Sequence, residues 1–142
     1  MSDRQFLYAS GVVQGEVLVA TITVERLRDA MEAYALRDEL ISLLDSSNAR
    51  SVVIDMGKIH YTGTVLFLAF LGVRWHLGDA RIVLCNLSEP VREMFAISRM
   101  IPSETPNPKP APFEVAPTLP DALARLTAIA TCSDSLESGS GG

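Results

Sequence analysis

Two hydroxyl side chains flank a glycine in Thr62-Gly63-Thr64, between a strand-like run and a long apolar run. A hydroxyl at the start of a helix can cap it by accepting a hydrogen bond from a free backbone N–H. It can instead carry a phosphoryl group, which the amides and the dipole of the helix N-terminus would hold. We interpret Thr62 or Thr64 as a helix cap. Two alternatives stay open: phosphorylation of Thr64, and a surface that binds something else.

Asp55 and His60 are two further polar residues near this stretch. Asp55 lies near the end of the apolar run "VVIDM", where binding sites of α/β proteins gather, but we favour a hydrogen bond to loop amides at the strand end as its role. His60 could activate a hydroxyl only with an orienting acid and an oxyanion hole, and no motif supplies either. GxGxxG, GxxxxGK[ST], GxSxG and HExxH are absent as well. We therefore expect no enzyme activity and no cofactor.

The remaining candidates for chemistry are two cysteines and a tryptophan. Cys85 lies in the apolar run "RIVLCN" and Cys132 lies in a polar tail, and their spacing does not suggest a disulfide. His60 and His76 have no Cys or His neighbour at metal-ligand spacing, so no metal site is expected. We interpret Trp75 and the phenylalanines around it as packing residues and not as a cofactor site.

Composition limits the class of protein. The 142 residues are 48% hydrophobic and 20% charged, which is typical of one globular domain. A net charge of −5 without a Lys/Arg cluster argues against nucleic acid as a partner. The longest apolar run, Val65 to Val73, is too short to cross a bilayer, and the N-terminus lacks a signal-peptide pattern. We expect no membrane insertion and a cytoplasmic location.

Hydrophobic periodicity predicts alternating strands and helices. A hairpin turns at Gln14-Gly15, with Leu18, Ala20, Ile22 and Val24 facing the core. Ser88 and Thr118 are predicted to cap the last two helices, with Asp121 in a capping-box-like position after Thr118. The elements are a hairpin in residues 5–24, helices over 29–49, 64–77, 88–98 and 120–130, and strands over 51–56, 80–86 and 113–119.

This order predicts an α/β fold: a mixed β-sheet with an N-terminal hairpin and about four α-helices packed against it. Residues 1–130 form a single domain, which includes a proline-rich loop at 102–112, and residues 131–142 are expected to be a disordered tail. The helix over 64–77 is apolar almost all round. Either other elements cover it, or one flank is exposed as a partner-binding patch.

The stretch "VVIDMGKIHYTGTVLFLAFLG" resembles the STAS domain (sulphate transporter and anti-sigma factor antagonist). Asp55 takes the place of that family's strand-end Asp or Asn. Its Asp-Ser-Ser-Gly motif is degenerate here, because Gly63 falls on the Asp, Thr64 on the first Ser, and Val65 and Leu66 on the last two positions. The first Ser is the residue that is phosphorylated in anti-sigma factor antagonists.

Two further stretches, "ARIVLCNLSEPVREMFAIS" and "FEVAPTLPDALARL", resemble later parts of the family, so that the resemblance covers residues 5 to 130. It implies a module that binds an anti-sigma factor, a histidine-kinase-like serine/threonine protein kinase, and thereby releases a sigma factor. Phosphorylation of Thr64 would switch binding off. The implied partner-binding surface consists of Asp55, Thr62, Gly63, Thr64 and Phe67.

Two alternatives to this function stay open. A degenerate STAS domain could be a scaffold subunit of a signalling or transport complex, assembling as a homo-oligomer without phosphorylation. It could also sense a small ligand, which would need an apolar pocket because the sequence has no phosphate-binding loop.

Overall fold

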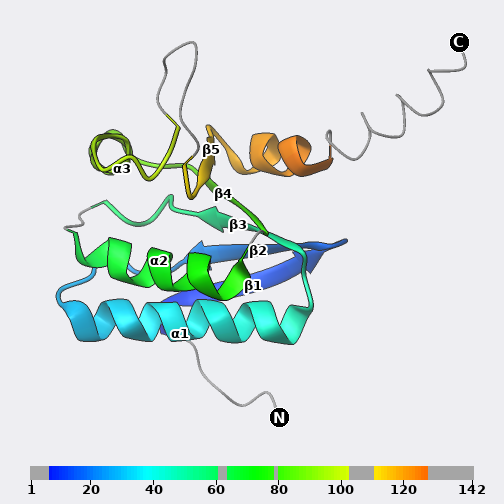
Figure 1. Cartoon of the computed structure of the whole chain (residues 1–142), viewed down its shortest axis with the longest axis horizontal. Coiled ribbons are helices and arrows are strands. Elements are labelled where there is room, and N and C mark those ends of the chain that lie inside the picture. The colour runs from blue at the N-terminus through cyan, green and yellow to red at the C-terminus, as the bar shows by residue number, and fades with distance from the viewer. Residues whose placement is uncertain (1–6, 61–63, 79, 103–110, 128–142) are drawn as a thin grey trace, which may run out of the picture.

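A five-stranded mixed β-sheet forms the centre of the molecule (Figure 1). The structure is a computed structural model, and it describes residues 7–60, 64–78, 80–102 and 111–127. The strands lie in the order β1-β2-β3-β4-β5; β1 and β2 are antiparallel, and the later pairs are parallel. Their bounds are β1 Ala9–Gln14, β2 Val17–Ile22, β3 Ser51–Asp55, β4 Arg81–Cys85 and β5 Glu114–Ala116. The predicted mixed sheet and N-terminal hairpin are confirmed.

The hairpin turn lies one residue later than predicted. Gln14 pairs with Val17, so the two loop residues are Gly15 and Glu16. Gly15 has a φ of 63°, a left-handed conformation that glycine adopts without a steric penalty. The sequence pattern placed Gln14 in the turn because a polar residue before a glycine is typical of a turn.

Four helices accompany the sheet, in the predicted order. α1 begins after Asp29, whose carboxylate accepts a hydrogen bond from the Glu32 N–H, and ends at Asn48, which has a left-handed φ of 55°. α2 ends at Gly78, which has a φ of 64°. The helices are α1 Ala30–Ser47, α2 Val65–Leu77, α3 Glu89–Ile97 and a last helix over residues 119–127.

The two faces of the sheet are buried by different helices. Alternate residues of β3, Val52 and Ile54, belong to a core cluster that also contains buried residues of α1, α2 and α3. Val53, between them, belongs to a second cluster with Val83, Cys85 and Ala116, covered by the helix over 119–127. A parallel strand that is covered on both faces reads as a continuous apolar run, as "VVI" does. On β2, Leu18, Ala20 and Ile22 face the first cluster as predicted.

The two predicted helix caps differ in outcome. The Asp121 N–H donates to Thr118 Oγ1 at 3.3 Å, and the Thr118 hydroxyl donates to Asp121 Oδ2 at 3.0 Å, so that cap is confirmed. Ser88 occupies the N-cap position of α3, but its hydroxyl makes no capping bond, so the prediction for Ser88 is wrong. Most of the proline-rich loop, Cys132 and the tail at 131–142 lie outside the described residues.

Candidate partner-binding site

One side of α2 is packed into the core by the sheet and by α1. Its buried residues are Leu66, Ala69, Phe70 and Val73, which recur at helical spacing. α1 approaches closely at Gly72, where an added Cβ would lie 2.4 Å from Cδ of Arg37. The missing side chain of Gly72 therefore leaves room for the Arg37 stem to pass between the helices.

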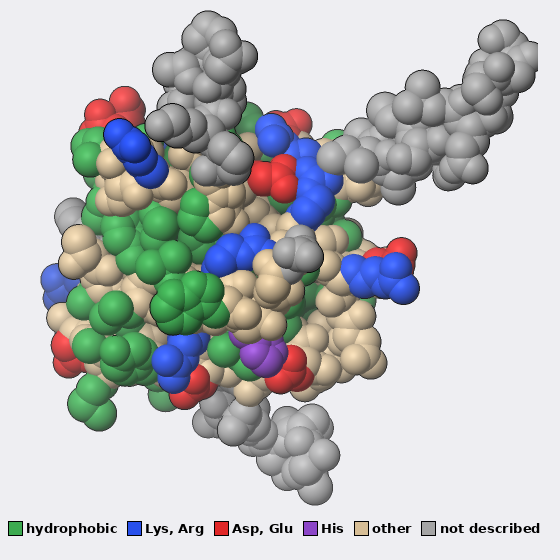
Figure 2. Space-filling model, in the orientation of Figure 1, with side chains coloured by type: hydrophobic (Ala, Val, Ile, Leu, Met, Phe, Trp, Pro, Cys, Tyr) green, Lys and Arg blue, Asp and Glu red, His purple; other side chains and the backbone are tan. Residues whose placement is uncertain are grey.

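The opposite side of α2 carries a mainly exposed row of residues, which we call the α2 stripe: Thr64, Leu68, Leu71 and Trp75. Spacings of four, three and four residues place them on one face of the helix. Leu68 is 40% exposed and Trp75 is 82% exposed, whereas Leu71 is partly buried. Eleven residues of helix separate the ends of the stripe by about 16 Å. Figure 2 shows hydrophobic side chains gathered on this side of the molecule, over α2.

The exposure of Trp75 corrects the interpretation of this residue as packing. The phenylalanines do pack: the Phe67 ring meets Phe95 of α3 edge-on, with centroids 5.0 Å apart and planes at 84°. Phe70 lies 5.8 Å from Phe95 and 5.7 Å from Phe113. Phe67 is thus a half-buried residue that joins α2 to α3 beside the stripe, and Trp75 is the most exposed large apolar residue of α2.

Thr64 does not cap α2 with its side chain. It occupies the N-cap position, but its backbone is already helical, with φ −64° and ψ −13°, and its hydroxyl makes no capping bond. A capping hydroxyl needs an extended backbone to reach the free N–H groups of the first turn. The Thr64 carbonyl instead accepts from the Phe67 N–H at 3.0 Å. The capping interpretation is therefore wrong for Thr64, while Thr62 and Gly63 lie outside the described residues.

Asp55 is bonded into the loop that follows β3. Its Oδ1 accepts from the Gly57 N–H at 2.9 Å and from Nδ2 of Asn86 at 3.1 Å. The bond from the Gly57 N–H confirms the predicted contact with a loop amide, and the bond from Asn86 also ties the ends of β3 and β4 together. Burial, and then the charge of Asp55, raise the pKa of the Cys85 thiol to about 12, so Cys85 is a neutral core residue.

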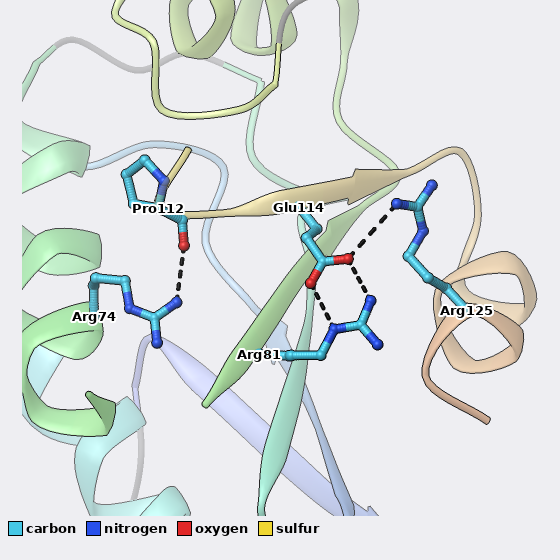
Figure 3. A network of polar contacts seen from close by, with 5 residues as sticks. All are labelled: Arg74, Arg81, Pro112, Glu114 and Arg125. Atoms are coloured by element: carbon cyan, nitrogen blue, oxygen red, sulfur yellow. Dashed lines mark hydrogen bonds and ion pairs between the residues drawn. The ribbon is translucent and has the colours of Figure 1, made fainter. Parts of the chain in front are cut away.

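Polar contacts at the other end of α2 fix its position. Arg74 donates from Nη1 to the Pro112 carbonyl at 2.9 Å (Figure 3). Its Nη2 donates to the Gly78 and Ala80 carbonyls. His76 Nε2 lies 2.8 Å from Oδ1 of Asp45 on α1. These contacts hold α2, which carries the stripe, against α1 and the segment before β5.

A second network, also in Figure 3, joins β4, β5 and the last helix. Arg81 Nε donates to Glu114 Oε2 at 2.7 Å, and Arg125 Nη1 lies 3.7 Å from Glu114 Oε1. The hydrogen bond from Arg81 lowers the pKa of Glu114, against the opposing effect of burial. Sequence reasoning missed the contacts from Arg74 to Pro112 and from Arg81 to Glu114, because the two residues of each pair are 38 and 33 positions apart along the chain.

Among the described residues, no group of three or more His, Cys, Asp or Glu side chains could hold a metal ion. Within the same part of the chain, no helix is long and apolar enough to cross a membrane.

Comparisons with known proteins agree with this architecture. The family model of the STAS domain matches residues 12–122. The anti-sigma factor antagonist SpoIIAA in its unphosphorylated form is similar in structure, with 18% identity, a TM-score of 0.63 and coverage of 84% of this chain and 96% of that one. A Moorella thermoacetica RsbS variant with a serine-to-glutamate substitution is similar too, with 13% identity, a TM-score of 0.64 and coverage of 87% and 97%. No curated protein matches the chain.

Proposed function

This chain belongs to the STAS domain family, and from that premise we propose that it is a reversible protein-binding module of the anti-sigma factor antagonist type. Its docking surface is the α2 stripe, and phosphorylation of Thr64 switches binding off. The observation that carries the proposal is the placement of an exposed hydroxyl that makes no capping bond at one end of an exposed apolar row.

The stripe has the composition of a binding surface. An aromatic residue with most of its area exposed, on the same helix face as an exposed leucine two turns away, is typical of a protein–protein interface. Burying Trp75 and Leu68 against a partner would remove apolar surface from water that the fold itself leaves uncovered. The packing of α2 against α1 and α3 presents this surface without rearrangement, which lowers the entropic cost of binding.

The position of Thr64 supports a switch. A phosphoryl group there would add about −1.5 to −2 charges at the rim of an apolar docking surface. A bound partner would bury that charge at a cost in desolvation free energy, which weakens the complex. The dipole at the N-terminus of α2 would stabilise the phosphorylated form of the free chain. Both effects favour dissociation after phosphorylation.

The nature of the partner is proposed from the family. One structurally similar protein is an anti-sigma factor antagonist described in its unphosphorylated form. By this likeness, the partner would be an anti-sigma factor that is also a histidine-kinase-like serine/threonine protein kinase. Asp55 takes part only indirectly, because its bonds to Gly57 and Asn86 fix the start of the loop that leads toward Thr64.

Affinity capture followed by a kinase assay tests this proposal. The immobilised full chain should capture a protein with a histidine-kinase-like ATP-binding domain from a lysate of the source organism. The purified partner should then transfer one phosphate from ATP to the chain, and mass spectrometry should locate it on Thr64. Thr64→Ala should accept none, whereas Thr64→Ser should accept it again.

A matched control is Thr127→Ala, which removes an exposed threonine from the last helix on the other face of the sheet. It should be phosphorylated like the wild type. Phosphate on Thr64→Ala, or no transfer to the wild type by a partner that binds it, would refute the switch.

A further inference from the structure

The two edges of the sheet are protected to very different degrees. β5 is three residues long, is followed by Pro117, and carries Glu114, which is ion-paired with Arg81. Short length, charge and proline are the features that natural proteins use to prevent pairing at a sheet edge. β1, at the opposite edge, is six residues long and contains no charged residue and no proline.

The middle of β1 is also open to solvent. Five of its six residues are exposed, and the large ones among them include Val12, with 62% of its surface exposed, and Val13, with 47%. Neither valine belongs to a core cluster. An uncharged edge strand of this length, with two exposed valines at its centre, is a template for pairing with another strand.

The register of the hairpin shows which backbone groups are available. Gln14 and Val17 flank the two-residue turn and form a hydrogen-bonded pair, and such pairs alternate along an antiparallel ladder. The N–H and C=O groups of Gly11 and Val13 therefore point away from β2. The Ala9 N–H follows the same alternation, but it donates to Glu39 Oε1 at 3.0 Å, so α1 already occupies that end of the edge.

We propose that β1 pairs with β1 of a second copy of this chain, antiparallel about a twofold axis that passes between the two Val12 residues. Gly11 then pairs with Val13 of the partner subunit, and each such pair exchanges two hydrogen bonds. Val12 faces Val12 of the partner subunit as the close, non-hydrogen-bonded pair. This register pairs the outward-pointing backbone groups of Gly11 and Val13. It does not require the Ala9 N–H, which donates to Glu39.

A second copy is the partner that this strand fits. With no charge on either strand, two copies meet without like-charge repulsion at the interface, although each chain has a net charge of −5. A twofold interface is closed, because each copy uses the same strand. Pairing of β1 with β5 of another copy would build an open filament, and the protection of β5 described above opposes it.

One six-residue strand buries less than the roughly 1,200 Å² of a stable protein–protein interface, so the dimer should be weak. Dissociation constants in the range of about 1 to 500 μM are expected for such contacts. The surface is different from the α2 stripe, so this inference does not depend on the proposed function, and failure of one leaves the other standing.

Disulfide trapping tests the register. In a Cys132→Ser background of the full chain, Val12→Cys should form an intermolecular disulfide under mild oxidation, because the close pairs of an antiparallel ladder lie within bonding distance. Ser10→Cys is the matched control: it lies on the same face of β1, two residues away, but in this register it faces residue 14 of the partner subunit. Ser10→Cys should stay unlinked.

The dimer itself is tested by sedimentation of the unmodified chain over that concentration range. The average mass should rise toward twice the monomer mass, and Val12→Lys should lower the association constant at least tenfold while the circular dichroism spectrum is unchanged. A wild-type chain that remains monomeric at about 500 μM, or equal cross-linking of Val12→Cys and Ser10→Cys, would overturn the proposal.

Discussion

At Thr64, the prediction of a helix start is correct, whereas the prediction of a side-chain cap is wrong. Threonine before an apolar run predicts a helix start, and α2 does start there. The pattern also predicts a capping bond, but capping depends on the backbone angles of Thr64, which a local sequence pattern does not specify. At Trp75, likewise, the predicted position in the helix is correct, whereas the interpretation as a packing residue is wrong. A helix that is apolar all round does not indicate which of its sides the other elements leave exposed.

Trp75 provides the sharpest prediction at this scale. Trp75→Ala should weaken binding of the kinase-like partner at least tenfold, or about 1.4 kcal/mol, because large aromatic residues dominate interface energies. Since the side chain is 82% exposed, the free energy of unfolding should change by less than about 0.5 kcal/mol. Titration calorimetry and urea denaturation measure the two quantities.

The control for Trp75 is Leu7→Ala. Leu7 is 68% exposed at the approach to β1, beside Glu39 of α1, and it is not part of α2. This variant should bind the partner as the wild type does. If Trp75→Ala and Leu7→Ala bind equally well, the stripe is not the docking surface.

At the scale of elements, the structure depends on long-range polar contacts that tie strands to helices. Strand and helix positions follow from local apolar periodicity, so the sequence predicted each of them to within a few residues. The contacts between elements join residues such as Ala9 and Glu39, or Arg81 and Glu114, about 30 residues apart. No local pattern marks such pairs, so the sequence left them unassigned.

Glu39 joins β1 to α1. Its carboxylate accepts from the N–H groups of Leu7, Tyr8 and Ala9 at 3.0, 2.8 and 3.0 Å. Glu39→Ala leaves these donors without that acceptor and should lower the free energy of unfolding by about 2 kcal/mol. Glu39→Gln keeps one acceptor oxygen and should lose less.

Urea denaturation measures the effect of these variants, and hydrogen exchange should become faster at residues 8 and 9 first. Glu93→Ala, which removes an exposed glutamate from α3, is the control and should change the stability little. Equal effects of Glu39→Ala and Glu93→Ala would contradict the assigned role.

Glu114 makes the stability of the fold depend on pH in the acidic range. Its folded pKa lies below the ordinary value of 4.5, chiefly because Arg81 donates a hydrogen bond to the ionised carboxylate. The stability that this provides is fully present above pH 4.5 and is lost as the pH falls through the lower folded pKa. Glu114→Gln should therefore melt below the wild type at pH 7, and the gap should narrow below about pH 4.5.

Calorimetric melting of both chains from pH 7 to about pH 3 measures this gap. Other carboxylates titrate in both chains, so the difference between the two isolates Glu114. A gap that stays constant or widens in acid would show that the ion pair contributes nothing to stability.

At the scale of the whole molecule, the fold could be predicted from the sequence, whereas the exposed surfaces of α2 and β1 could be predicted only in part. The order of strands and helices, the hairpin and the two buried sheet faces follow from periodicity and from apolar runs such as "VVI". Which side of α2 stays exposed depends on where α1 and α3 pack, as does the half-buried position of Phe67. The open edge at β1 likewise becomes visible only when the strand order is known.

The two surfaces suggest a molecule with separate contacts for two kinds of partner. The α2 stripe carries the hydroxyl that would regulate a partner protein, and β1 offers an edge to a second copy. Because they lie on different elements, a dimer could present two stripes at once. A dimeric kinase would then bind with higher overall affinity, because the second binding event is intramolecular and occurs at a high effective concentration.

The affinities of three chains for the purified kinase-like partner test the central claim most directly. By titration calorimetry, Thr64→Ala should bind within about twofold of the wild type, whereas Thr64→Glu should bind at least tenfold more weakly, a difference of about 1.4 kcal/mol. This result would mean that negative charge, and not loss of the hydroxyl, weakens the complex. Equal affinities of all three chains, or an equal loss in Thr64→Ala and Thr64→Glu, would contradict the account.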